Sequence, residues 1–249
     1  MDPEFRVGKV VSKSFSIYFK NFVPFTVTAM VLILPATICS IAAILGHFSP
    51  ISTKTLTLSA QIANFLLGCV ISGALVFASF EALRGNSPSV GASMSKGFRA
   101  AFAVVIVSIL VGLLVGVGFL LLVVPGIIAI AVCAVAIPAA VVEKPGLIGA
   151  LERSKELTKG YRWRILGVFL LYAIIVFVAS AVMNLAIGFG VMASGAKLSG
   201  GLILGAATID WVLSAMMAAL NASLAAVMYH DLRVVKDGVG IEELASVFD

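Results

Sequence analysis

The chain has 249 residues and a net charge of +5; 61% of its residues are hydrophobic and only 12% are charged. Soluble globular domains carry about 25% charged residues, so this composition excludes an ordinary soluble protein. The mean hydropathy of +1.15 and the repeated long apolar runs predict an all-α polytopic membrane protein. The alternating pattern of an outer-membrane barrel is absent from the sequence.

The sequence divides into one large unit and two short ends. Residues 1–5 lack the layout of a signal peptide, in which basic residues precede an apolar run, and we interpret them as a remnant of cloning outside the fold. Residues 6–237 are predicted to form a single six-helix membrane domain, and residues 238–249 a short cytoplasmic tail.

Six apolar stretches are predicted to be transmembrane helices, because about 20 apolar residues in a helix cross a bilayer. They comprise residues 22–45, 58–81, 99–123, 126–142, 163–192 and 202–229. The fourth stretch is short and contains Pro138, so whether it crosses completely is left open. Pro24 and Pro35 predict kinks in the first span, and Val123–Gly126 predicts a tight turn between the third and fourth spans.

The distribution of positive charge predicts the orientation. With the N-terminus inside, all but two of the 17 Lys and Arg residues lie on the inner side; the exceptions are Lys54 and Lys197. The positive-inside rule therefore places both termini in the cytoplasm. We expect a multi-pass protein of the cell inner (cytoplasmic) membrane.

Three basic segments resemble one another. Val7–Phe15 (VGKVVSKSF) and Val90–Phe98 (VGASMSKGF) share Val, Gly, Ser, Lys and Phe at the same five places, and Leu157–Arg162 aligns with Met94–Arg99. Each segment comes before an odd-numbered span. The pattern predicts three transmembrane hairpins, each preceded by a basic amphipathic cytoplasmic lead-in helix.

The first lead-in separates its charges from its apolar residues. On a helix, Arg6, Lys9, Lys13 and Lys20 fall on one side, and Val11, Phe15, Tyr18 and Phe22 fall on the other. This arrangement suits a helix in the membrane interface, with its rings among acyl chains and its cations among anionic headgroups. Alternatively, the cations only set the topology.

The candidate lipid-headgroup residues of the three lead-ins are all basic. They are Arg6, Lys9, Lys13, Lys20, Lys96, Arg99, Arg153, Lys155, Lys159, Arg162 and Arg164. Membrane lipids are therefore the expected partners, with anionic headgroups favoured. A protein partner or a homo-oligomer is left open. Nucleic acid is not expected to bind, because membrane topology already accounts for the cations.

Two stretches carry a family resemblance. The first contains Ile137-Pro138-Ala139, Glu143, Gly149-Ala150-Leu151, Arg153-Ser154, Lys159-Gly160 and Arg162-Trp163, and the second contains Tyr229-His230-Asp231-Leu232-Arg233 and Glu242-Glu243-Leu244. They resemble the membrane domain attached to some bacterial glycerophosphoryl diester phosphodiesterases, and related stand-alone integral membrane proteins. The resemblance implies a six-helix membrane module. In those enzymes a separate barrel domain carries the phosphodiester chemistry, so no such activity is expected here.

Polar residues inside the predicted spans mark a candidate intramembrane site. Asp210, Asn184 and Asn64 lie at similar depths from the outer ends of their spans, so they are predicted to converge in an outer-leaflet polar pocket. Alternatively, Asp210 and Trp211 mark a helix end at the interface. Gly112 and Gly116 form a small-xxx-small pair that predicts close helix packing.

The sequence offers no catalytic constellation. His47 and His230 lie on opposite sides of the predicted membrane, the three cysteines lie in apolar runs, and no cofactor or metal site is expected. The first hypothesis is a non-enzymatic, lipid-interacting module that scaffolds or regulates partners at the cytoplasmic leaflet. The alternative is a transporter or channel for a lipid or small solute that uses the outer-leaflet pocket, and a membrane-embedded enzyme ranks third.

Overall fold

The computed structural model describes residues 5–45, 50–143, 146–193 and 200–238. These residues form α-helices and contain no strand. The helices are α1 (Val7–Lys20), α2 (Phe22–Leu45), α3 (Pro50–Leu83), α4 (Val90–Leu121), α5 (Val123–Val132), α6 (Ala136–Val142), α7 (Leu147–Thr158), α8 (Arg162–Ala193) and α9 (Gly200–Asp237). Lys197, the Glu242–Leu244 match and residues 1–4 lie outside the described residues.

The structure confirms a helical protein with helices suited to a membrane. Five segments of the described chain are long and apolar enough to cross a bilayer, and a sixth arises if α1 and α2, bent by 82°, count as one span. The five are Gln61–Leu83, Val90–Leu121, Val123–Val142, Arg162–Ala186 and Leu204–Asp237. The number of true crossings and the side on which each end lies stay predictions.

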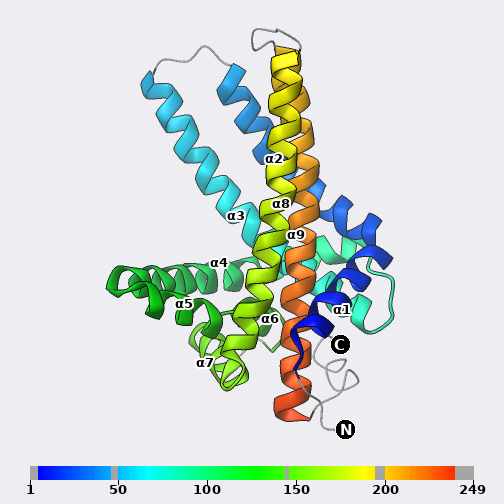
Figure 1. Cartoon of the computed structure of the whole chain (residues 1–249), viewed down its shortest axis with the longest axis vertical. Coiled ribbons are helices and arrows are strands. Elements are labelled where there is room, and N and C mark those ends of the chain that lie inside the picture. The colour runs from blue at the N-terminus through cyan, green and yellow to red at the C-terminus, as the bar shows by residue number, and fades with distance from the viewer. Residues whose placement is uncertain (1–4, 46–49, 144–145, 194–199, 239–249) are drawn as a thin grey trace.

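The helices do not form one parallel bundle. Figure 1 shows α2 and α3 slanting toward the end of the molecule where α8 ends and α9 begins, whereas α4 and α5 cross α8 and α9 at a steep angle. At the opposite end of α9 lie α1 and α7. We call this end, which carries Lys13, Arg153 and Arg233, the basic end.

Helix α1 differs from the predicted interfacial helix in what covers its aromatic face. Tyr18 is only 2% exposed, its hydroxyl lies 3.3 Å from Thr26 Oγ1, and Phe15 is half-buried against the core. The helix packs along α9 and α8 instead of placing these rings among acyl chains. Val11, Phe15 and Tyr18 of the predicted apolar face pack in or against the core, whereas Phe22 begins α2 and is 36% exposed. Periodicity carries no information about the surface that covers such a face.

The second lead-in is not a separate helix. Val90–Phe98 forms the first turns of α4, which continues without a break to Leu121. The helix begins at Ser89, whose side chain accepts a hydrogen bond from the backbone N–H of Ala92 at 3.2 Å. No proline or turn interrupts the chain after this start, so basic and apolar segments share one helix.

The fourth predicted span is broken. Helix α5 ends at Val132 and α6 begins at Ala136, so the irregular residues 133–135 precede Pro138. The predicted tight turn also shifts, because Leu122 alone is extended between α4 and α5 and Val123–Gly126 forms the first turn of α5. Pro125 lies in this first turn of α5, where a proline is tolerated because a backbone N–H there would have no helical partner.

Phe5 belongs to the fold, contrary to its assignment to a cloning remnant. Its side chain is 1% exposed and packs against Tyr161 with the two rings tilted and 5.8 Å between their centroids. Its carbonyl oxygen accepts a hydrogen bond from Arg164 Nη1 at 2.7 Å. The first described residue therefore anchors the entry to α1 against the start of α8.

A glycine outside the predicted pair allows two helices to pack closely. A Cβ on Gly112 or Gly116 would meet nothing within 4 Å, so these residues face open space. A Cβ on Gly97 would lie 2.6 Å from Ala74 Cβ and 2.9 Å from Val70 O. Gly97 therefore sets the approach of α3 to α4.

Gly97→Ala is expected to destabilise the protein by about 1–3 kcal/mol, because α3 and α4 must separate to admit the methyl group. Gly112→Ala, the same change on the same helix, is the matched control and should leave stability nearly unchanged. Thermal unfolding in detergent measures both. Equal melting temperatures for the two variants would contradict the Gly97 contact.

Candidate functional site

A large cavity lies among α2, α3, α8 and α9. Its volume is about 1340 Å³. Its lining on α9 extends from Gly201 to Ala225, a length of about 36 Å at 1.5 Å per residue. Its lining also includes Cys133 and Ala134, from the break between α5 and α6, and Pro138 of α6. The cavity thus follows α9 over a distance comparable to the hydrocarbon core of a bilayer, about 30 Å.

The three polar residues singled out inside the predicted spans all line this cavity. Asn64 comes from α3, Asn184 from α8 and Asp210 from α9. All three side chains are exposed, so the cavity is open beside them. Asn184 Nδ2 donates to the backbone carbonyl of Ser180 at 2.7 Å.

Asp210 does not lie at a helix end. It is the eleventh residue of α9 as described, and the helix continues beyond it to Asp237. Within the part of the chain that the structure describes, its carboxyl group has no ion pair or hydrogen bond. Asn221 is also exposed and lines the same cavity further along α9.

Two hydrogen bonds hold α9 in position beside the cavity. Trp211 Nε1 donates to the backbone carbonyl of Met30 in α2 at 3.1 Å, and Tyr172 Oη of α8 donates to the carbonyl of Met217 at 3.2 Å. Trp211 thus links α9 to α2 by a hydrogen bond, and this link constrains the orientation of the neighbouring Asp210.

The cavity chemistry suits an amphiphile. Most lining residues are aliphatic or small, and a few polar groups stand among them. Ligand sites of this kind gain affinity from apolar contact and orientation from a small number of polar groups. A lipid or another elongated amphiphile matches both the length and the composition.

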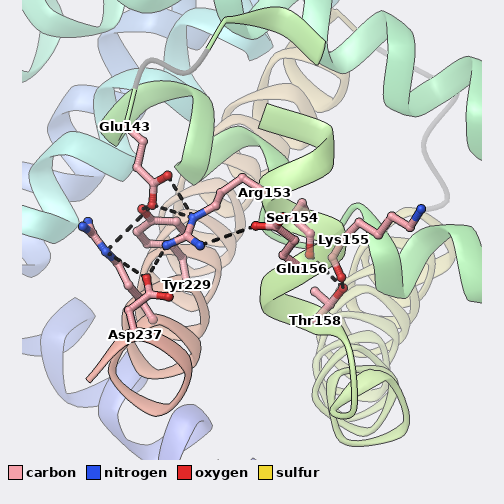
Figure 2. A network of polar contacts seen from close by, with 9 residues as sticks. Glu143, Arg153, Ser154, Lys155, Glu156, Thr158, Tyr229 and Asp237 are labelled. Carbon is pink, nitrogen blue, oxygen red and sulfur yellow. Dashed lines mark hydrogen bonds and ion pairs between the residues drawn. The ribbon is translucent and has the colours of Figure 1, made fainter. Parts of the chain in front are cut away.

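A second polar group lies at the basic end (Figure 2). Arg153 of α7 donates from Nε to Glu143, with distances of 3.1 and 3.0 Å to its two carboxylate oxygens, and forms an ion pair with Asp237 at the end of α9. Tyr229 Oη donates to Glu143 Oε1 at 2.5 Å. Arg233 Nε lies 3.8 Å from Glu143 Oε1 and 3.6 Å from Asp237 Oδ2.

These contacts join α6, α7 and α9. Burial alone lowers the pKa of the Arg153 guanidinium, but its hydrogen bonds to Asp237 and Glu143 raise that pKa above its ordinary value. Arg153 is therefore cationic at any physiological pH. Its carboxylate partners account for its charge, so this candidate headgroup residue has a structural role in the fold.

The neighbouring Ser154 bridges the α5–α6 break. Its buried hydroxyl donates to the carbonyl of Val132 at 2.6 Å and accepts from the N–H of Val135 at 3.3 Å. Both backbone groups lie where the helical ladder is interrupted, and buried backbone groups without partners are costly. Ser154 thus replaces part of the missing helical hydrogen bonding.

A third contact joins α1 to α9. Lys13 Nζ donates to Asp231 Oδ1 at 2.9 Å and lies 3.4 Å from His230 Nδ1, which is 3.0 Å from the same carboxylate oxygen. Lys13 is separated from Asp231 by more than 200 positions in the sequence, so no local pattern indicated the pair. Asp231 therefore holds one of the predicted headgroup cations.

The remaining headgroup candidates divide by exposure. The side chain of Lys96 is half-buried, with its Nζ 5.5 Å from the centre of the Phe77 ring, and Arg162 is also half-buried. Arg164 bonds Phe5 and lies over the Tyr161 ring. Arg164 is nevertheless exposed, as are Arg6, Lys9, Lys20, Arg99, Lys155 and Lys159.

Most residues of the basic-end network were not selected as site residues. Glu143, Tyr229, Asp231 and Arg233 were quoted only for the family resemblance, whereas Asp237 carried no signal. The two resembling stretches, far apart in the sequence, meet in this network. Both stretches resemble the same family, and this shared resemblance was the available signal that they are in contact.

The family model described as "Domain of unknown function (DUF7847)" matches residues 5–232. The chain belongs to this family. No curated protein and no solved structure matches the chain. The matched range begins at the buried Phe5 and includes both the cavity and most of the basic-end network. Within the described residues no group of three His, Cys, Asp or Glu side chains is placed to hold a metal ion.

Arg153→Gln is expected to lower the free energy of unfolding by about 1.5–3 kcal/mol, because Glu143 and Asp237 lose their charged hydrogen bonds and keep only the longer ion pairs with Arg233. Lys155→Gln, on the exposed face of the same helix, is the matched control and should change little. Thermal unfolding in detergent compares them. Equal stability of both variants would contradict the clamping role of Arg153.

Proposed function

We propose that this protein is a non-enzymatic, multi-pass protein of the bacterial inner membrane that binds a lipid in the cavity of α2, α3, α8 and α9. The observation that carries the proposal is the cavity itself, with about 1340 Å³ of space and Asn64, Asn184 and Asp210 in its lining. Its occupant is a membrane lipid or an amphiphile of similar length.

The proportions of the cavity support a lipid over a small polar solute. The lined stretch of α9 is about as long as one bilayer core, and aliphatic side chains dominate its walls. A polar solute would leave those walls without favourable contacts. The exposed amide and carboxyl groups offer hydrogen-bonding partners to a headgroup or ester.

The proposed topology has six spans in three hairpins, with both termini in the cytoplasm. Its support is the charge distribution, which leaves only two cations on the outer side. In this orientation the basic end faces the cytoplasm and Asp210 belongs to the outer half. A 32-residue helix such as α4 or α8 is about 48 Å long, so each still crosses about 30 Å of hydrocarbon when strongly tilted.

The basic end provides a surface for scaffolding or regulating partners at the cytoplasmic leaflet. Lys155 of α7 and Lys159, which directly follows that helix, are exposed and free to contact anionic headgroups, whereas Arg153 and Lys13 are held by carboxylates. This division supports a surface contact through a subset of the predicted cations. The proposed relation to the membrane domain of glycerophosphoryl diester phosphodiesterases rests on the sequence motifs.

Filling the cavity tests lipid binding. Gly205 lines the cavity, and a Cβ there meets nothing within 4 Å, so Gly205→Phe is expected to enter the cavity without disturbing α9. We expect about tenfold less lipid retained through purification, because the ring occupies the ligand volume. Native mass spectrometry of the detergent-solubilised protein measures retained lipid.

Gly116→Phe is the control, because Gly116 is equally open but lies on α4 outside the cavity. Its retained lipid should equal that of the unaltered protein. Unchanged retention in Gly205→Phe would remove the support for the cavity as a lipid site.

A second candidate function is transport of the lipid or a small solute. The observation that favours it is Asp210, a carboxyl group in the cavity without a partner among the described residues. A group of this kind in a membrane span is suited to couple substrate movement to a proton. The helix pairs on either side of the cavity would then move relative to each other.

Under the transport hypothesis, Asp210→Asn is expected to abolish pH-dependent flux of a fluorescent lipid analogue in proteoliposomes. The amide keeps the size of the side chain but does not exchange a proton. Glu152→Gln, on the exposed surface of α7, is the control for loss of one carboxyl group. Flux that keeps its pH dependence in Asp210→Asn would exclude Asp210 as the coupling group.

A further inference from the structure

A smaller cavity lies at the elbow between α1 and α2. Its volume is about 480 Å³, within the range of about 300–1,000 Å³ typical of ligand pockets. Helix α1 and Asn21 form most of it, and the last turn of α3 closes the other side. The lining residues are Lys9, Ser12, Lys13, Ser16, Ile17, Lys20, Asn21, Ala82 and Leu83.

The polar lining comes from one face of α1. Lys9, Ser12, Lys13, Ser16 and Lys20 are spaced by three, one, three and four residues. At 3.6 residues per turn these side chains fall within about 100° around the helix axis. Three ammonium groups and two hydroxyl groups therefore face the same space.

The cationic charge of this face is only partly compensated. Asp231 neutralises Lys13 and holds its ammonium group in place at 2.9 Å. In the described part of the structure, Lys9 and Lys20 have no carboxylate partner. Lys9 and Lys20 are 11 residues apart, about 16 Å along the axis of α1, and the like charge nearest to Lys9 within α1 is Lys13, four residues on. An anion in the pocket would compensate the positive charge that Asp231 leaves on this face.

We infer that this elbow pocket binds a phosphate group carried by an organic ligand. Ammonium groups form strong charge-assisted hydrogen bonds to phosphate oxygens, and serine hydroxyl groups donate to them as well. Asn21 is part of the lining. Its side-chain amide donates to the carbonyl of Ile17 at 3.1 Å, so it provides a partner for one carbonyl at the end of α1. The pocket therefore presents donors to an anion.

The shape of the pocket exceeds a bare phosphate ion. Ala82 and Leu83 add an apolar wall from α3, opposite the basic face of α1. A phosphorylated lipid headgroup and a free phosphate ester share the chemistry that this lining recognises. The site is separate from the large cavity and does not depend on its occupant.

The decisive feature is the participation of Ser12 and Ser16, because a plain basic surface depends only on charge. Ser12→Ala/Ser16→Ala removes two donors from exposed helical positions and leaves the charge unchanged. Lys9→Gln/Lys20→Gln removes the two uncompensated cations. Lys155→Gln/Lys159→Gln removes two exposed cations from α7 and is the matched control for net charge.

Three probes separate the sources of the phosphate. Dioctanoyl phosphatidic acid carries a phosphate and acyl chains, sn-glycerol 3-phosphate carries the phosphate alone, and dioctanoylglycerol carries the chains alone. Each is titrated into the full-length protein in detergent, and bound ligand is counted by native mass spectrometry. Binding of both phosphate compounds supports a general phosphate-ester site, and binding of phosphatidic acid alone supports a lipid-headgroup site.

We expect phosphatidic acid to bind about tenfold more weakly to Lys9→Gln/Lys20→Gln, and several-fold more weakly to Ser12→Ala/Ser16→Ala. The α7 control and Gly205→Phe should keep the affinity of the unaltered protein, which separates this pocket from the large cavity. An unchanged affinity in the serine variant would overturn the inference. Equal binding of dioctanoylglycerol, or equal weakening by the α7 control, would overturn it as well.

Discussion

The structure depends on the bifurcated hydrogen bond from Arg153 Nε to the two carboxylate oxygens of Glu143. Glu143 directly follows α6, Arg153 lies on the following helix, and the same guanidinium reaches Asp237 at the end of α9. Without this cation, Arg233, at 3.8 Å from Glu143 and 3.6 Å from Asp237, would be the remaining positive charge beside the two carboxylates and the Tyr229 hydroxyl. Removing one member of a partly buried ionic group is more costly than the group's net contribution suggests, because the partners stay behind.

The contact between Arg153 and Glu143 also positions the wall of the large cavity that α6 and the α5–α6 break form. Cys133, Ala134, Ile137 and Pro138 line the cavity, and their position follows from α6, which is held by Glu143 at one end and by Ser154 at the other. On the other side, α9 runs from the cavity to the same network without interruption. The polar contacts of the basic end therefore hold the apolar walls at a fixed separation.

The sequence predicted features that follow from composition along one segment. Long apolar runs predicted the helices, and similar depth in their spans grouped Asn64, Asn184 and Asp210, which the structure places around one cavity. Contacts between distant segments were not predictable in this way. Gly97 and Gly112 have equal propensities, and only the position of Ala74 distinguishes them. Lys13 has the same local pattern as Lys9, and only Asp231 sets it apart.

The three similar basic segments illustrate why sequence likeness does not determine a common role. The first forms α1, which packs on α9 and turns its lysines toward a pocket. The second continues into α4 and contributes Gly97 to the contact with α3. The third begins in α7, where Arg153 and Ser154 face inward while Lys155 and Lys159 face outward. Each segment is amphipathic, and its role depends on which partner its inward face meets.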